Sequence, residues 1–261
     1  MNSLVPFEMP TDLTSWARLI DHTLLKPDTT AESVKNLVRE AWDWGFWSVC
    51  LYPSWLSHAR QLLTELWEGH LASHTPKFQQ TEAIHLPQLC AVVGFPSGAQ
   101  TSKIKLEETQ DAIQWGAQEI DWVIPIGYYL SGGESFRAVI KKELKEMVHA
   151  TRFEGALSKV IIETSFLSGD QIRELSGWCA EAGADFVKTS TGFGFRGASL
   201  EDIQIIAETL KGTRTQIKAS GGIRDFKTAL MLVQAGAHRI GSSASVKIMQ
   251  EMQMALFQRP V

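Results

Sequence analysis

Cysteine is scarce in this chain of 261 residues, and its three cysteines, Cys50, Cys90 and Cys179, are widely spaced. This scarcity argues against a disulfide framework and favours a reducing, cytoplasmic setting. Long apolar runs are also missing, since none approaches the roughly 20 residues that a membrane-spanning helix needs. Residues 1–13 hold no basic region ahead of an apolar stretch, so we expect no signal peptide.

Basic runs are absent too, and the formal net charge is -4. A chain of this charge has no electrostatic reason to bind nucleic acid or an anionic membrane surface, so we expect neither partner. Metal-binding patterns are also lacking, because the spaced pair His70 and His74 has no evident third ligand. We therefore predict no metal site.

What the sequence does have is a regular alternation of strand-like and helical segments. Short β-branched runs occupy 89–95, 119–126, 158–164, 185–190 and 215–220, with stretches of 3.6-residue apolar spacing between them. Because parallel strands need helical crossovers, this alternation predicts βαβ units and a parallel sheet. The length suits a single α/β domain of the (β/α)8 or TIM-barrel type, for which about 250 residues is typical. A doubly wound open sheet is the alternative.

A second regularity is a glycine that follows a helix and precedes a strand, at Gly45, Gly116, Gly183 and Gly236. Such a glycine can adopt the left-handed conformation that ends a helix. If the first strand lies at 19–23, these four units fall on strands 2, 4, 6 and 8, and alternate strands of a barrel contribute side chains to one layer. The fifth residue after each glycine should then lie at a similar height: Cys50, Asp121, Lys188 and Gly241.

We predict one domain over residues 1–261, with an N-terminal extension at about 1–16. The segment at about 69–87 is polar and interrupts the alternation, so we predict a long loop there. This loop would join a helix to the next strand. It would therefore lie on the face opposite to the one that barrel enzymes use for catalysis.

Charged residues in otherwise apolar strands indicate the candidate site, because burying a charge is unfavourable. Period-two alternation sends Asp21, Asp121 and Lys188 into the barrel, and Lys218 follows Ile217 on the seventh strand. Two ammonium groups about 6 Å apart repel by about 3 kcal/mol at an effective dielectric constant near 20. Repulsion between Lys188 and Lys218 would favour a neutral amine that attacks a carbonyl. An internal salt-bridge lattice, or a lysine that binds phosphate, is the alternative.

A phosphate site is indicated where the seventh and eighth strands end. Residues 220–224 (SGGIR) open a helix after the seventh strand, and residues 241–243 (GSS) end the eighth. Glycines let the backbone approach an anion, and helix N-termini present free N–H groups to it. These two loops often bind phosphate in barrels of this type. Thr191 and Gly192, after the sixth strand, would add donors, whereas plain tight turns are the alternative reading.

Taken together, these segments resemble the deoxyribose-phosphate aldolases, a family of class I aldolases. The matching motifs lie in order along the chain and read LIDHTLL (19–25), VCLYP (49–53), GFPSGA (94–99), EID (119–121), KVIIET (159–164), FVKTSTGF (186–193), KASGGIR (218–224) and RIGSS (239–243). The combination of KTSTG with KASGG is the most specific part of the match.

The resemblance implies a role for each matching residue. Lys188 would form a Schiff base with the substrate, Lys218 would perturb Lys188 and assist proton transfer, and Asp121 would act in a proton relay. The pocket positions would be Asp21, Cys50 and Thr191 for the substrate and Gly192, Gly221, Gly222, Arg224, Gly241, Ser242 and Ser243 for its phosphate.

The reaction that the resemblance implies is reversible cleavage of 2-deoxy-D-ribose 5-phosphate to acetaldehyde and D-glyceraldehyde 3-phosphate. The iminium is itself an electron sink, so no cofactor is expected. The expected partners are small phosphorylated sugars and aldehydes, and a homo-oligomer is left open. The alternatives are a Schiff-base barrel for another small phosphorylated aldehyde or keto acid, and a non-catalytic barrel that binds sugar phosphates. The chain lacks the terminal tyrosine of some family members, so we assign no proton-transfer role to its C-terminus.

Overall fold

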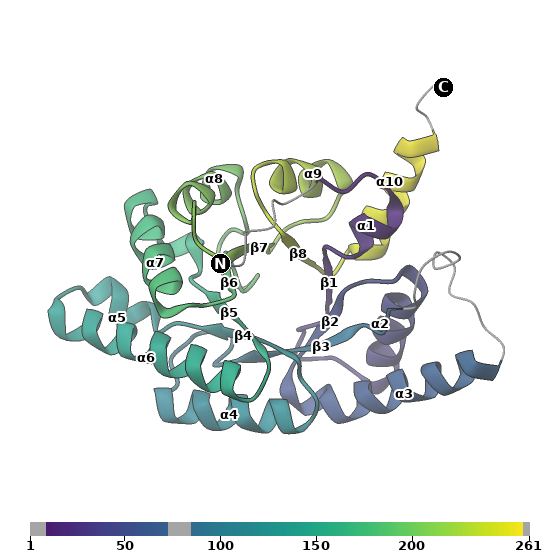
Figure 1. The fold of residues 1–261 in the computed structure, drawn as a ribbon, viewed down its shortest axis with the longest axis horizontal. Coiled ribbons are helices and arrows are strands. Elements are labelled where there is room, and N and C mark those ends of the chain that lie inside the picture. Colours follow the sequence, from purple (N-terminus) through teal and green to yellow (C-terminus); the bar gives the residue numbers. More distant parts are fainter. Residues whose placement is uncertain (1–8, 73–84, 258–261) are drawn as a thin grey trace.

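The computed structural model describes residues 9–72 and 85–257, and its centre is a closed parallel barrel (Figure 1). Each strand pairs with its neighbours in sequence, and β8 pairs with β1. The strands are β1 (Ile20–Thr23), β2 (Ser48–Leu51), β3 (Gln88–Val93), β4 (Glu119–Val123), β5 (Leu157–Ile161), β6 (Phe186–Lys188), β7 (Gln216–Ser220) and β8 (Arg239–Ser242). The predicted (β/α)8 barrel is confirmed. The open-sheet alternative is wrong, because β1 and β8 close the ring.

Helices surround the barrel and cover its outer surface (Figure 1). Those that connect or follow the strands are α2 (Ala31–Trp44), α3 (Leu56–Ala72), α4 (Ser102–Gln114), α6 (Glu134–Phe153), α7 (Gly169–Ala182), α8 (Leu200–Thr209), α9 (Phe226–Gln234) and α10 (Ser245–Phe257). Four short elements complete the described chain: α1 (Leu13–Ala17), α5 (Ile126–Ser131) and the 3-10 turns η1 (Pro53–Trp55) and η2 (Thr164–Phe166). Within the described ranges, no helix combines the length and the apolar character needed to cross a membrane.

Local sequence signals set the ends of several helices. The side chains of Thr30, Ser168 and Ser199 each form a capping box with the third residue of the helix that follows. Helices α2 and α7 end at Gly45 and Gly183, whose φ angles of 70° and 79° are left-handed, as predicted for the glycines that precede strands. These ends return the chain to β2 and β6, two of the strands that carry site residues.

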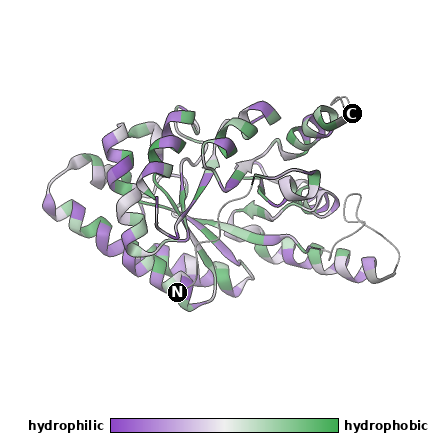
Figure 2. Ribbon diagram, turned by 45° about the horizontal axis from the view of Figure 1, so that its top comes forward, coloured by the Kyte–Doolittle hydropathy of each residue, from purple (hydrophilic) through white to green (hydrophobic). Residues whose placement is uncertain are grey.

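The main hydrophobic core lies between the barrel and its helices. Ile120, Trp122 and Ile124, in and just after β4, are fully buried in it. Asp121, between them, contacts Lys218 of β7 across the interior of the barrel. Hydrophobic and hydrophilic residues are interspersed along the helices, as expected for helices that lay one face on the strands (Figure 2).

The two segments predicted to leave the barrel pattern contain regular structure. Helix α3 continues to Ala72, so the first part of the predicted loop at 69–87 is helical. Residues 73–84 of that segment lie outside the described residues. The predicted extension at 1–16 includes most of α1, which is capped by Asp12, and its Trp16 is buried against Phe226. The described end of this extension therefore packs on the barrel.

Candidate active site

Asp121 lies at the centre of a buried ionic network inside the barrel. Its Oδ1 accepts a hydrogen bond from Lys159 Nζ at 2.8 Å. Its Oδ2 accepts one from Lys188 Nζ and one from Lys218 Nζ, each at 2.7 Å. The three lysines come from the consecutive strands β5, β6 and β7. The closed barrel thus directs three ammonium groups at one fully buried carboxylate.

The predicted proximity of Lys188 and Lys218 is confirmed, but the structure places a carboxylate between them. Both nitrogens lie 2.7 Å from the same oxygen of Asp121, so at most twice that distance separates them. Burial alone would lower the pKa of Lys218, but the charges of Asp121 and Asp21 outweigh burial and raise this pKa well above its usual value. Attraction to Asp121 therefore opposes the repulsion that the sequence argument treated alone.

The same contacts set the charge of Asp121. Burial would raise the pKa of this carboxyl, but Lys159, Lys188 and Lys218 hold the pKa well below its usual value. Asp121 is therefore a carboxylate in the free protein at neutral pH. It orients the amines and accepts their hydrogen bonds, and loss of charge from one of these ammonium groups would make it easier to protonate.

Asp21 ties the network to β1 and β8. Its Oδ1 accepts hydrogen bonds from Ser48 Oγ and Arg239 Nη1, each at 2.7 Å, and its Oδ2 pairs with the ammonium group of Lys218. Burial alone would raise the pKa of Asp21, but Arg239, Lys218 and nearby Lys159 hold it far below its usual value. Lys218 is thus held from two sides, by carboxylates of β1 and β4.

Three network residues were not identified from the sequence: Lys159, Glu119 and Arg239. Lys159 Nζ lies 2.7 Å from a Glu119 oxygen, and Arg239 Nη1 lies 3.3 Å from the other. A signal for them was present. Glu119 and Arg239 stand two residues before Asp121 and Gly241, so period-two alternation places them on the same inward face. Lys159, a charged residue in an apolar strand, met the criterion used for Lys188.

The structure brings together three of the four residues predicted to share a layer, namely Cys50, Asp121 and Lys188. The Cys50 sulfur lies 4.0 Å from the carboxylate of Asp121, which also contacts Lys188. Gly241, the fourth, lies beside Lys218, because a Cβ atom built there would approach Lys218 Cε to 3.0 Å. Glycine at this position of β8 therefore leaves room for the side chain of Lys218.

Two thiols and a carboxylate form the one group in the described residues with the composition of a metal site. The ligand atoms of Cys50, Cys90 and Asp121 lie within 4.8 Å of one another. Three ammonium groups already contact this carboxylate, and they would repel a cation. Burial, followed by the hydrogen bond with Cys50, raises the pKa of Cys90 well above its usual value, so this thiol stays protonated. The cluster therefore suits amine chemistry better than metal binding.

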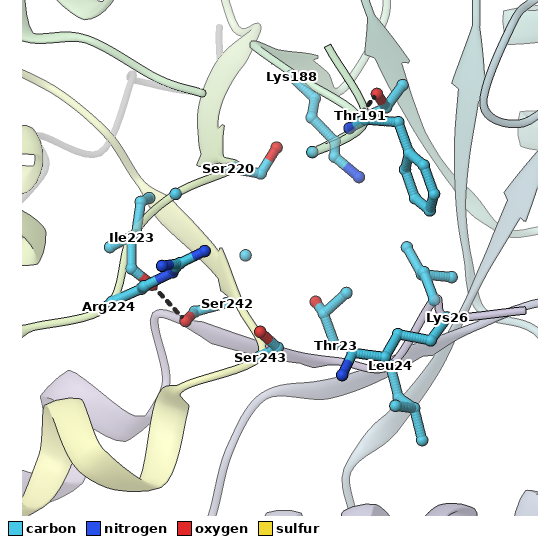
Figure 3. A pocket seen from close by; sticks show the side chains of 16 residues that line it. Thr23, Leu24, Lys26, Lys188, Thr191, Ser220, Ile223, Arg224, Ser242 and Ser243 are labelled. Atoms are coloured by element: carbon cyan, nitrogen blue, oxygen red, sulfur yellow. Dashed lines mark hydrogen bonds between the residues drawn. The ribbon is translucent and has the colours of Figure 1, made fainter. Parts of the chain in front are cut away.

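A pocket of about 250 Å³ opens above this network at the C-terminal ends of the strands (Figure 3). Its lining includes Lys188, whose side chain points into the cavity. Asp21, Cys50, Asp121 and Lys218 do not belong to this lining. Asp21 and Cys50, which the resemblance placed at the substrate, thus lie in or beside the network below the pocket. Among the described network residues, Lys188 is the one that reaches the cavity.

The other predicted pocket residues all lie on its wall: Thr191, Gly192, Gly221, Gly222, Arg224, Gly241, Ser242 and Ser243. The loops after β7 and β8 are joined by a hydrogen bond of 2.7 Å from Ser242 Oγ to the carbonyl oxygen of Ile223 (Figure 3). Gly221 has a φ of 83°, and a Cβ atom built there would lie 3.0 Å from Gly197 Cα. A larger residue at this position would be strained, as expected where loops must approach closely.

A third basic residue at the pocket wall, besides Lys188 and Arg224, was not predicted from the sequence. Lys26 lines the cavity beside Thr23, on the side opposite Arg224 (Figure 3). It follows directly after the first matching motif, on the loop that leaves the C-terminal end of β1. A basic residue just past a strand end was an available signal. The pocket therefore offers an anion the positive charges of Lys26 and Arg224 in addition to its glycine and serine loops.

Comparison with known proteins gives the same family as the motifs. The model of the DeoC/LacD family aldolases matches residues 16–251. The deoxyribose-phosphate aldolase of Caldanaerobacter subterraneus subsp. tengcongensis is 41% identical over 90% of this chain and 92% of its own length. That of Alkaliphilus oremlandii is 43% identical over 90% of this chain and 95% of its own length.

Among solved structures, the deoxyribose phosphate aldolase of Aeropyrum pernix superposes with a TM-score of 0.78 at 33% identity. The match covers 93% of this chain and 92% of that one. The family match thus spans the barrel strands, the ionic network and the pocket described above. The chain belongs to the DeoC/LacD family of aldolases.

Proposed function

We propose that this aldolase reversibly cleaves 2-deoxy-D-ribose 5-phosphate to acetaldehyde and D-glyceraldehyde 3-phosphate, with Lys188 forming the Schiff base. The observation that carries the proposal is the position of Lys188. It joins the buried network through Asp121 and, among the described network residues, is the one that lines the pocket. The curated relatives of 41% and 43% identity, which match over nine tenths of this chain, carry the name of this activity.

The ionic contacts of the network distinguish Lys188 from its other basic groups. In the described residues it holds one more basic group than carboxylates: Lys159, Lys188, Lys218 and Arg239 against Asp21, Glu119 and Asp121. Three of the basic groups contact at least two carboxylates, whereas Lys188 contacts one. Lys188 is therefore the basic group of the network with the fewest ionic contacts, and it is also the one that lines the pocket.

The synthetic direction begins when the neutral amine of Lys188 attacks the carbonyl carbon of acetaldehyde. The carbinolamine loses water, with a proton from Lys218 passing to the departing hydroxyl, and an iminium forms. The iminium nitrogen withdraws electrons, so the α-carbon gives a proton to water or to Asp121 and an enamine results. The enamine carbon bonds to the aldehyde carbon of D-glyceraldehyde 3-phosphate, and the aldehyde oxygen takes up the proton that the α-carbon gave away. Water then hydrolyses the new iminium, which releases the product and restores Lys188.

The phosphate of the substrate binds to the loops after β7 and β8. Glycines at 221, 222 and 241 allow the backbone to approach an anion, and Ser243 adds a hydroxyl group. Arg224 contributes a charged donor on the same wall. Holding the phosphate there directs the rest of a short sugar towards Lys188, which lines the same cavity. Binding energy from a group that does not react thus orients the group that does.

The competing function is a barrel that binds sugar phosphates without catalysis. It requires a permanently protonated Lys188 in an ion pair, and the contact between Lys188 and Asp121 is present at 2.7 Å. Turnover distinguishes the two functions. The assay supplies 2-deoxy-D-ribose 5-phosphate and measures the D-glyceraldehyde 3-phosphate formed through coupled oxidation of a nicotinamide cofactor.

The wild-type protein is expected to turn over, and Lys188→Met is expected to lose at least about a thousandfold in kcat. The matched control is Lys142→Met, because Lys142 lies on the outer face of α6 with its side chain 75% exposed. It should keep wild-type activity. Binding of the sugar phosphate without turnover by the wild-type protein would establish the non-catalytic barrel instead.

Assembly and location form a further part of the proposal. We propose that the chain forms a homo-oligomer, because the Aeropyrum pernix relative is described as tetrameric. Sedimentation velocity would show a single species heavier than the 29.0 kDa chain, and a monomer at micromolar concentration would contradict this. We also propose a cytoplasmic location, which is supported by three cysteines that are buried and outside any disulfide.

A further inference from the structure

Glu163 has a backbone conformation that side-chain-bearing residues rarely adopt. It follows β5 directly and precedes η2, with φ at 50° and ψ at 70°. Among the described residues, every other residue with φ in the left-handed region is a glycine. Glu163 is also only 2% exposed. A glycine would adopt this conformation without strain, so the glutamate side chain must provide a contact that maintains the strained backbone.

The carboxylate of Glu163 holds the segment that follows Lys188. Its Oε2 accepts a hydrogen bond from the backbone N–H of Thr191 at 3.0 Å and a second from the hydroxyl group of Thr191. Its Oε1 accepts one from Ser165 Oγ at 3.1 Å. Thr191 Oγ1 in turn accepts a hydrogen bond from the backbone N–H of Phe193 at 3.0 Å. Hydrogen bonds to a buried charged acceptor are among the stronger ones in proteins.

This segment separates two cavities. Thr191 and Phe193 line the pocket of about 250 Å³ that contains Lys188, and they also line a neighbouring cavity of about 370 Å³. Glu163 lines the second cavity and not the first. The segment also packs tightly on the end of β5, since a Cβ atom built at Gly194 would lie 3.0 Å from Glu163 Oε1. The carboxylate therefore supports the wall of the substrate pocket from behind.

We infer that Glu163 is a positioning residue for substrate binding, which fixes Thr191 and the adjoining backbone at the pocket wall. The inference rests on the proposed function, because it takes this pocket to be the sugar-phosphate site. Glu163 acts through Thr191 and does not reach the Lys188 amine, which bonds to Asp121 instead. Arg196, a basic residue that the charge of Glu163 influences, is paired with Asp202. Loss of the carboxylate should therefore weaken binding of the phosphorylated substrate while leaving Schiff-base formation intact.

The test compares Glu163→Gln, Thr191→Val and the double variant in the cleavage assay. Each single change removes part of the same contact, so each should raise KM for 2-deoxy-D-ribose 5-phosphate by roughly tenfold, as expected for a hydrogen bond to a charged group. The double variant should raise KM no further than the more impaired of the two single variants, because both changes remove the same interaction. Thr191→Ser keeps a hydroxyl group and should show a smaller rise than Thr191→Val.

The matched control is Glu174→Gln. Glu174 also accepts a side-chain hydrogen bond, from Tyr129 Oη at 2.7 Å, but it lies on the outer helices. The Glu174→Gln variant should lower the melting temperature without raising KM for 2-deoxy-D-ribose 5-phosphate. If Glu163→Gln lowers kcat in step with the folded fraction while KM stays constant, Glu163 has only a structural role. The inference would also be contradicted if the rise in KM of the double variant equalled the product of the rises for Glu163→Gln and Thr191→Val.

Two further readouts separate this inference from the proposed function. Reductive trapping of acetaldehyde on Lys188 should proceed equally in the wild type and in Glu163→Gln, because the small aldehyde lacks a phosphate. Titration calorimetry with inorganic phosphate should show weaker binding to Glu163→Gln. If the wild type neither traps acetaldehyde nor turns over, the proposed function fails. If it does both and phosphate binding is unchanged in Glu163→Gln, the positioning role fails alone.

Discussion

Replacing Asp121 with asparagine tests how strongly the ionic network stabilises the barrel. The substitution keeps the shape of the side chain and removes the charge that three ammonium groups share, at 2.7 and 2.8 Å. All of these groups are almost completely buried. The variant therefore leaves three amines in the interior with one fewer counter-charge. We expect Asp121→Asn to be among the most destabilising single changes in this chain.

The magnitude follows from the geometry. Two unit charges at such a contact distance attract by about 6 kcal/mol at an effective dielectric constant near 20. Desolvation of each buried ion opposes this by several kcal/mol, so the net loss is smaller than the sum of the contacts. Breaking a buried ion pair by removing one partner typically costs about 3–5 kcal/mol. For a domain of this size, that loss lowers the melting temperature by roughly 6–20 °C.

Urea unfolding at pH 7, followed by tryptophan fluorescence, measures this loss. The matched control is Asp170→Asn, because Asp170 is an exposed acid of α7 whose pair with Arg173 lies in solvent. The control should change the free energy of unfolding by less than about 0.5 kcal/mol. An Asp121→Asn variant within about 1 kcal/mol of the wild type would show that the network contributes little net stability.

The difference in stability between the wild type and Asp121→Asn should depend on pH in a defined way. The folded-state pKa of Asp121 lies well below its usual value of 3.8, so folding favours the carboxylate. The stability that Asp121 contributes is therefore fully present above pH 3.8 and is lost as the pH falls towards the lower, folded-state pKa. The difference between wild type and Asp121→Asn should stay constant from pH 7 to about pH 5 and shrink below about pH 4. A difference that grows on acidification would contradict this.

Three further outcomes follow from the site. Lys218→Met should lower kcat by about 10²–10⁴-fold, because it removes the ammonium group that donates a proton, and unchanged kcat would remove Lys218 from the mechanism. Arg224→Ala should raise KM for 2-deoxy-D-ribose 5-phosphate by roughly tenfold and leave the slow cleavage of unphosphorylated 2-deoxyribose unchanged, whereas equal effects on both would argue against a phosphate contact. Treatment with a chelator should leave activity unchanged, and a loss restored by zinc would contradict Schiff-base chemistry.

The parts of this structure that could be predicted were those governed by strand and helix periodicity. The glycines that end α2 and α7 marked where β2 and β6 begin, and alternation along β4 placed Asp121 inside the barrel. The same rule, applied to every charged strand residue, would also have found Glu119 and Arg239. Both residues begin their strands, whereas barrel catalysis occurs at the C-terminal ends of strands, so the search for catalytic residues did not reach them.

Other features depend on distances that only the closed barrel sets. Alternation shows that Asp121 and Lys218 point inward, but not that a carboxylate of β4 lies between amines of β6 and β7. The sequence therefore predicts the repulsion between the two lysines, but not the attraction to Asp121 that opposes it. The contact of Glu163 with Thr191 was likewise beyond reach, because a left-handed glutamate leaves no pattern in the sequence.

Reductive trapping on Lys188 tests the central claim most directly. The protein is incubated with acetaldehyde and sodium borohydride, digested and examined by peptide mass spectrometry. The account predicts an added ethyl group on Lys188, with Lys159 and Lys218 unmodified because Lys188 is the network lysine on the pocket wall. Trapping on Lys218 or Lys159, or no adduct in a protein that still cleaves 2-deoxy-D-ribose 5-phosphate, would contradict it.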